Sequence, residues 1–200
     1  MPLPRRSTRL FLLPSLCLFL LAGVAAAAGA TRMVHANGWA VTAPNGWNAF
    51  QGEHALGADF RMFAPRDLDA ACAFYSRSGL GLGMTNDQIR SALGASTMLE
   101  SAIADFLQAD ELFPGELSDI EVFKVAPQIE HPSGWPFQRA SFTYFDGGTQ
   151  ASGGKPSVGW AAITFKNDAV YVAYCGANNS SVEPSKKAIS VILNTIEMTR

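Results

Sequence analysis

The chain has 200 residues, of which 48% are hydrophobic and 16% charged, and its formal net charge at pH 7 is −2. The first 30 residues hold three of its 15 basic residues and no acid, leaving 12 basic against 17 acidic ones, a net charge of −5. The other 170 residues are enough to bury the core of one domain. Their acidic balance argues against binding to nucleic acid or to an anionic lipid surface.

The first 30 residues have the plan of a secretory signal peptide. Three arginines precede the apolar run LFLLPSLCLFLLAGVAAAAGA, residues 10–30, which ends in small residues. The small-residue rule favours cleavage after Ala30, with a cut a few residues earlier as the alternative. An uncleaved membrane anchor is the alternative, because the run is long enough to span a bilayer. We predict a signal peptide over residues 1–30, a single domain over residues 31–200, and a periplasmic or secreted protein.

Three cysteines are present, and Cys17 lies within the predicted signal peptide. Cys72 and Cys175 remain, and two cysteines in an exported domain are most simply a disulfide. Such a bridge would close a loop of about a hundred residues, which the chain-entropy model credits with about 4–5 kcal/mol at most. The alternative is two buried thiols that pack as small apolar residues.

Short strands are predicted first. Alternation of apolar with smaller or polar side chains predicts strands over residues 39–43 and 60–64, and the run AACAFYS predicts a third that contains Cys72. Glycines then alternate over residues 79–83 ahead of a predicted helix, the order in which many proteins hold a phosphate. The dinucleotide fingerprint needs a further glycine where Met84 or Asn86 stands. We therefore interpret these glycines as a pliable connection and predict no cofactor.

A long helix and four strands follow. The pattern over residues 85–88 is a capping box, and an apolar stripe continues from it to near Asp110. Four alternating stretches come next, the last two joined by a tight turn at residues 166–168. The Gly-rich segment over residues 146–157 is interpreted as a flexible loop. Ser180 or Ser181 caps a final helix. Its apolar stripe comprises Ile189, Ile192, Leu193 and Ile196.

No residue pattern assigns a reaction. His35, His54 and His131 lack the paired spacing of metal ligands, so no metal site is predicted. His131 is interpreted as a residue of a surface turn, and Trp135, between a glycine and a proline, as a tryptophan at an exposed edge. No nucleophile elbow is present, and no catalytic residue is predicted. Catalytic residues can be scattered along a chain, so an enzyme stays open as an alternative.

The order of elements resembles that of the PsbP-like superfamily. The resemblance is carried by the opening WAVTAPNGW, residues 39–47, and by the closing AVYVAYCGANNSSVEPSKKAISVILNTIEM, residues 169–198. It implies an α+β fold in which an antiparallel sheet of about six to seven strands is flanked by helices as an α/β/α sandwich. Cys72 and Cys175 would then join an early strand to the strand before the last helix. The resemblance also implies a binding or accessory role rather than a fixed chemistry.

We therefore predict an exported, non-enzymatic accessory or binding protein of the cell envelope. Its partner is expected to be another protein or a small apolar ligand. Two alternatives stay open, which are an exported hydrolase-like enzyme with a dispersed active site and a structural component of the envelope.

Overall fold

The computed structural model describes residues 29–55, 58–95, 117–126, 131–146 and 150–199. The predicted signal peptide, up to residue 28, and the predicted continuation of the first helix past residue 95 lie outside these residues. In chain order the described strands and helices are β1 (Thr31–His35), β2 (Trp39–Ala43), β3 (Asn48–Gln51), β4 (Phe60–Phe63), β5 (Ala70–Ser78), α1 (Asn86–Ala95), β6 (Leu117–Ala126), β7 (Gln138–Asp146), β8 (Lys155–Lys166), β9 (Ala169–Asn178), α3 (Val182–Asn194) and β10 (Glu197–Met198).

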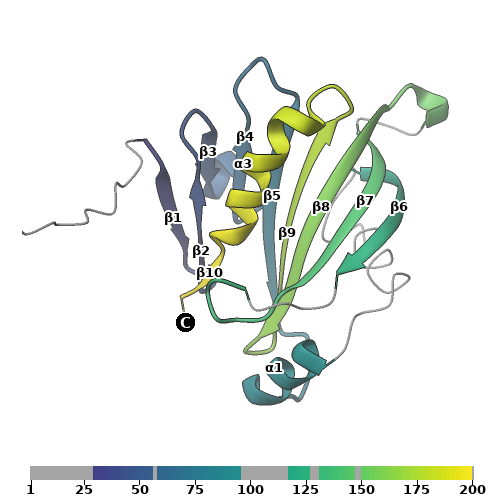
Figure 1. Cartoon of the computed structure of the whole chain (residues 1–200). Coiled ribbons are helices and arrows are strands. Elements are labelled where there is room, and N and C mark those ends of the chain that lie inside the picture. Colours follow the sequence, from purple (N-terminus) through teal and green to yellow (C-terminus); the bar gives the residue numbers. More distant parts are fainter. Residues whose placement is uncertain (1–28, 56–57, 96–116, 127–130, 147–149, 200) are drawn as a thin grey trace, which may run out of the picture.

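The described strands form two antiparallel sheets. The larger has seven strands in the order β3-β4-β5-β9-β8-β7-β6, and the smaller has three in the order β1-β2-β10. Helix α3 lies across one face of the large sheet, beside the small sheet, whereas α1 lies at the end where β8 turns into β9 (Figure 1). The predicted α+β fold with a central antiparallel sheet and flanking helices is confirmed.

The centre of the large sheet is the β8–β9 hairpin. The two strands pair continuously from Lys166↔Ala169 to Ser157↔Asn178. Asn167 and Asp168 at its tip have φ of 50° and 61°, the left-handed conformation that a two-residue hairpin turn requires. The tight turn predicted over residues 166–168 is therefore confirmed.

Strand β9 is buried on both faces, because each face of the large sheet carries its own apolar cluster. The cluster on one face also contains Ile189 and Leu193 of α3 and Trp39 of β2. The cluster on the opposite face contains aromatic residues of β5, β7 and β9. The continuous apolar run of β9 follows from this double burial, since a strand with one wet face would alternate with polar residues.

The two α-helices of the described residues begin as predicted. The backbone N–H of Thr85 donates to Oε1 of Gln88 at 2.8 Å, and the N–H of Gln88 donates to Oγ1 of Thr85 at 3.3 Å, which is a capping box. Ser181 is the N-cap residue of α3, but its hydroxyl makes no bond to the helix. That oxygen instead accepts the backbone N–H of Asp69 at 2.9 Å. The start of α3 is thus fixed to the turn before β5.

The predicted disulfide is present. Cys72 of β5 lies directly opposite Cys175 of β9, and the two sulfurs are bonded across a sequence separation of 103 residues. Both side chains are almost fully buried. The bridge therefore cross-links two neighbouring strands at the centre of the large sheet.

The small sheet was not predicted, although its central strand, over residues 39–43, was. That strand is β2, which pairs with β1 on one side and β10 on the other rather than with the large sheet. Asp59, just before β4, holds the small sheet against the large one. One carboxylate oxygen accepts Nε1–H of Trp39 at 2.9 Å, and the other accepts the amide of Asn37 at 3.2 Å.

Two glycines make room for aromatic rings on the face of the large sheet opposite α3. Gly159 of β8 and Gly176 of β9 are direct cross-strand neighbours. A Cβ atom on Gly159 would meet the ring of Phe142, and one on Gly176 would meet the phenol of Tyr144, each well inside the 3.0 Å that real Cβ contacts keep. Both rings therefore lie directly over bare backbone.

Candidate functional site

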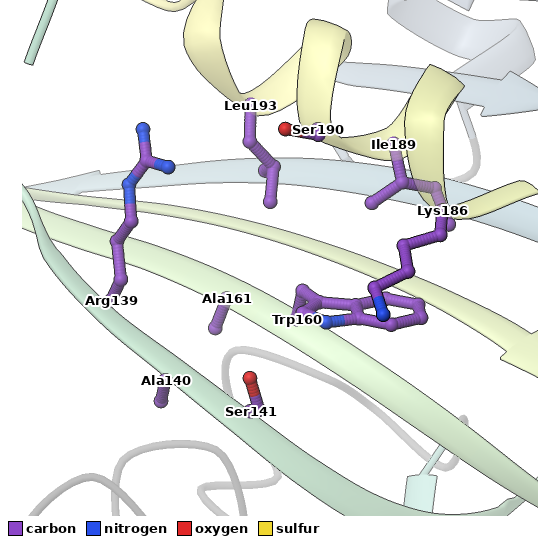
Figure 2. Close-up of a pocket in the computed structure, with 9 residues that line it drawn as sticks. All are labelled: Arg139, Ala140, Ser141, Trp160, Ala161, Lys186, Ile189, Ser190 and Leu193. Atoms are coloured by element: carbon purple, nitrogen blue, oxygen red, sulfur yellow. The ribbon is translucent and has the colours of Figure 1, made fainter. Parts of the chain in front are cut away.

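A groove with a volume of about 250 Å³ lies between α3 and the adjoining face of β7 and β8 (Figure 2). Its sheet side carries Arg139, Ser141 and Trp160, and its helix side carries residues of α3 from Lys186 to Leu193. We call it the α3 groove. It combines one large aromatic side chain with aliphatic walls, hydroxyl groups and two cations.

The alternation of side chains along β7 and the helical spacing of α3 determine which side chains face the groove. Successive residues of β7 point to opposite faces, so Arg139 and Ser141 share the face toward α3. Ser141 lies directly opposite Trp160 in the β7–β8 ladder, and this small neighbour leaves the indole room at the groove. Lys186, Ile189 and Leu193 follow the three- and four-residue spacing of one helix face. The groove is therefore built by a strand pair and a single helix stripe.

Arg139 is a half-buried cation at this site. Its Nη2 donates to Oδ1 of Asn194 at 2.6 Å, which fixes the guanidinium near the end of α3. Burial lowers the pKa of Arg139 from its ordinary value, although an arginine stays charged at neutral pH. Among the described residues no carboxylate forms an ion pair with it. Within the described part of the chain this half-buried charge is hydrogen-bonded to a neutral amide, an environment that favours the binding of an anion.

Lys186 provides a second, more mobile charge. It extends from α3 toward the indole of Trp160 (Figure 2). Its Nζ is 3.8 Å from Oε1 of Glu183, and both side chains are mostly exposed. Such a surface pair is weak and leaves the ammonium free to turn toward a ligand.

His131 is buried, which corrects its interpretation as a surface-turn residue. Only 3% of it is exposed, and its ring packs against Phe137. The backbone N–H of Ser133 donates to Nδ1 at 3.1 Å, and Nε2 is 2.9 Å from the carbonyl oxygen of Leu193. Because a carbonyl only accepts, Nε2 carries a proton. Because Nδ1 accepts the N–H of Ser133, it carries none, and the ring is neutral. His131 thus braces the end of α3, next to the groove.

Acidification is expected to weaken this brace. Burial lowers the pKa of His131 from its ordinary value, an effect that the carbonyl of Leu193 opposes and the charge of Arg139 reinforces. The unfolded chain therefore binds more protons, so this contribution to stability is complete above about pH 6.5 and is lost as the pH falls below that value. His131→Gln should lower the free energy of unfolding at pH 7 by about 1–2 kcal/mol.

Urea unfolding at pH 7, 6 and 5 tests this expectation. The free energy of unfolding should fall more steeply between pH 7 and 5 in the unmodified protein than in His131→Gln, whose other histidines are unchanged. Parallel pH profiles for the two proteins would contradict a neutral, buried His131.

Trp135 is also buried, which corrects its placement at an exposed edge. It is 7% exposed, and its Nε1–H donates to the hydroxyl of Thr164 at 2.9 Å. The Gly-Trp-Pro sequence does form a turn, but this turn folds onto β8. Residues typical of a turn do not indicate whether the turn packs against a distant strand.

The alternating glycines have the left-handed backbone that suits glycine, with φ of 77°, 62° and 62° at Gly79, Gly81 and Gly83. The N–H of Leu82 between them donates to Oδ1 of Asp168 at 2.7 Å. The N–H of Leu82 is thus bonded to a carboxylate of the chain itself. The loop fastens the exit of β5 to the β8–β9 turn.

The candidate site residues named from the sequence do not meet at the groove. Cys72 and Cys175 are in the core, and Ala30 is exposed immediately before β1. His35 lies in β1, where its Nδ1 is 3.7 Å from Asp59. The described residues contain no cluster of three or more side chains that could hold a metal ion. Nor does any helix in the described part of the chain have the length and apolar character to cross a membrane.

Sequence reasoning missed Arg139 and Lys186 as residues of a site, and it favoured a core position over a pocket for Trp160. One signal was available, because Arg139 is a charged residue in the alternating pattern of β7. Trp160 stands in the alternating pattern of β8 as a core residue would. Only the position of α3 over the sheet shows that its indole lines a groove.

No protein-family model matches this chain, and no curated protein matches it. Its structure is similar to cyanobacterial PsbP from Synechocystis sp. PCC 6803, with 13% identity, a TM-score of 0.45, and coverage of 88% of this chain and 96% of that one. LpqN of Mycobacterium tuberculosis, described as involved in cell envelope biogenesis, has 11% identity, a TM-score of 0.48, and coverage of 86% and 91%. A point mutant of Mog1 has 7% identity, a TM-score of 0.51, and coverage of 86% and 96%.

These similarities concern the fold, since all the identities are far below those of close relatives. The chain has the fold seen in Mog1, as the resemblance of its opening and closing segments implies.

Proposed function

We propose that this protein is an exported, non-enzymatic accessory protein of the cell envelope that binds a small apolar ligand with an acidic group in the α3 groove. The signal-peptide pattern and the disulfide support export, since disulfides persist in oxidising compartments. The first strand begins at Thr31, so cleavage after Ala30 would leave both sheets whole.

The observation that carries the proposal is the position of Arg139. Its guanidinium is held by Asn194, beside a cavity that also contains the indole of Trp160. An apolar ligand lying against Trp160 and the aliphatic face of α3 would bring an acidic group to Arg139. Lys186 would add a second contact from the helix. This combination of apolar walls with a few polar groups is typical of small-molecule sites.

The charge requirement is tested with 2-naphthoate and its neutral methyl ester, followed by tryptophan fluorescence. Naphthoate is expected to bind at the groove and to bind about tenfold more weakly to Arg139→Gln, because a charge-assisted hydrogen bond is lost. Ser190→Tyr, which fills the groove from its exposed helix side, should also abolish most of the binding.

Lys187→Gln is the matched control, since Lys187 is the neighbour of Lys186 but does not line the groove. It should bind naphthoate like the unmodified protein. Equal affinity for the acid and the ester, or an unchanged affinity in Arg139→Gln, would refute the proposed role of the groove.

A further inference from the structure

Two cations lie against one tryptophan ring at the end of the large sheet where β8 turns into β9. The guanidinium carbon of Arg90, on α1, is 4.4 Å from the ring centroid of Trp135, and Nζ of Lys166, at the end of β8, is 5.2 Å from it. Both distances are those of cation–π contacts. We call these three residues the Arg90–Trp135–Lys166 cluster.

Hydrogen bonds within the chain support the Arg90–Trp135–Lys166 cluster. Nη1 of Arg90 donates to the carbonyl oxygen of Gly134 at 2.5 Å, and the indole of Trp135 is fixed to Thr164. The backbone N–H of Asn167, next to Lys166, donates to Oδ1 of Asn86 at 2.8 Å, which ties the β8–β9 turn to α1. The guanidinium of Arg90 is therefore placed in advance and the backbone next to Lys166 is fixed, which lowers the entropy cost of binding an anion.

The two cations of the cluster form no direct ion pair within the described part of the chain. None of the ion pairs formed by described residues includes Arg90 or Lys166. Burial lowers the pKa of Lys166 from its ordinary value, and the charge of Arg90 lowers it further. An anion between the two cations would relieve their repulsion.

Neighbouring acids determine the size of the anion that fits. Asp87 lies one turn before Arg90 on α1, and Asp168 follows Lys166 in the β8–β9 turn. A continuous polyanionic surface, such as nucleic acid or an anionic membrane, would meet these carboxylates, whereas a short segment that alternates acidic with apolar residues can hold its carboxylates away from them. Met84, which is 42% exposed, precedes α1 at the same end of the molecule and offers apolar surface.

We propose that the Arg90–Trp135–Lys166 cluster is a docking point for the carboxylate side chains of an acidic, partly apolar segment of a protein partner. The carboxylate lies between the guanidinium of Arg90 and the ammonium of Lys166, and apolar side chains of the same segment contact Met84. This surface shares no residue with the α3 groove, so either site can fail its test without affecting the other.

The proposal is tested on the protein from Thr31 onward with two synthetic peptides, LEELE and its uncharged analogue LQQLQ. The NMR signal of the Trp135 indole N–H, assigned by its loss in Trp135→Phe, reports binding. LEELE should shift this signal to saturation, and LQQLQ should bind at least about tenfold more weakly, as expected for the loss of two exposed ion pairs.

Variants of Arg90 and Lys166 distinguish the loss of a charge from the loss of the folded structure. The double variant Arg90→Gln/Lys166→Gln should bind LEELE about tenfold more weakly, while Arg90→Lys, which keeps the charge, and the distant Lys187→Gln should keep most of the affinity. Their thermal midpoints check that each remains folded. Failure of LEELE to bind, equal binding of LQQLQ, or unchanged binding to the double variant would overturn the proposal. Inorganic phosphate that binds at least as tightly as LEELE would also overturn it, by assigning the cluster to a free anion.

Discussion

Reduction of the Cys72–Cys175 disulfide is expected to lower the free energy of unfolding by about 4 kcal/mol. The bridge spans 103 residues, so cutting it releases a long loop in the unfolded chain. The folded state should persist, because β5 and β9 remain joined by a continuous ladder. Urea unfolding of the same preparation, oxidised and in the presence of a phosphine reductant, measures the difference.

The double variant Cys72→Ala/Cys175→Ala is the control for the reductant. It should unfold at the same urea concentration with and without phosphine. Equal stability of the oxidised and reduced protein would mean that the bridge does not restrict the unfolded chain. Protein purified from its own host without reduction should also have a mass that lacks residues 1–30 and two hydrogens, and an uncut, reduced chain would contradict the proposed export.

Replacement of Gly176 by alanine is expected to destabilise the protein by about 3 kcal/mol, at the upper end for overpacked cores. The new Cβ would occupy the position of the Tyr144 phenol, so either the ring must leave its site or the strands must separate. Gly159→Ala should act in the same way through Phe142. Thermal and urea unfolding of each variant measures the loss.

A double-mutant cycle distinguishes this overpacking from an effect on strand propensity. Phe142→Ala removes the ring that Gly159 accommodates, so Gly159→Ala should cost little in that background. If Gly159→Ala costs the same with and without the ring, then the contact between ring and backbone is not its cause.

Alternation and capping patterns predicted much of the large sheet and the starts of both helices. Strands β8 and β9 and the turn between them follow from a strong local signal. The small sheet does not, because β10 has two residues and β1 shows little alternation. Both exist because β2 offers them its two edges. A pairing partner far away in the sequence, rather than a local pattern, determines these strands.

The candidate site was less predictable than the fold. Arg139 was visible as a charged residue on an otherwise regular strand, but its partner Asn194 comes from a different element. His131 and Trp135 both lie in segments with turn chemistry, which predicts exposure. Their burial depends on α3 and β8 folding over those turns, and no local pattern contains that information.

Strand β2 pairs with an early strand, β1, and a late one, β10, so the small sheet depends on both ends of the described chain. Arg32 and Glu197 form a bond across 165 residues, and β10 pairs beside the fully buried Trp39. A chain that emerges amino end first has nothing to complete this sheet until its last residues arrive. The small sheet is therefore completed only once β10 has left the ribosome, however early β1 and β2 are made.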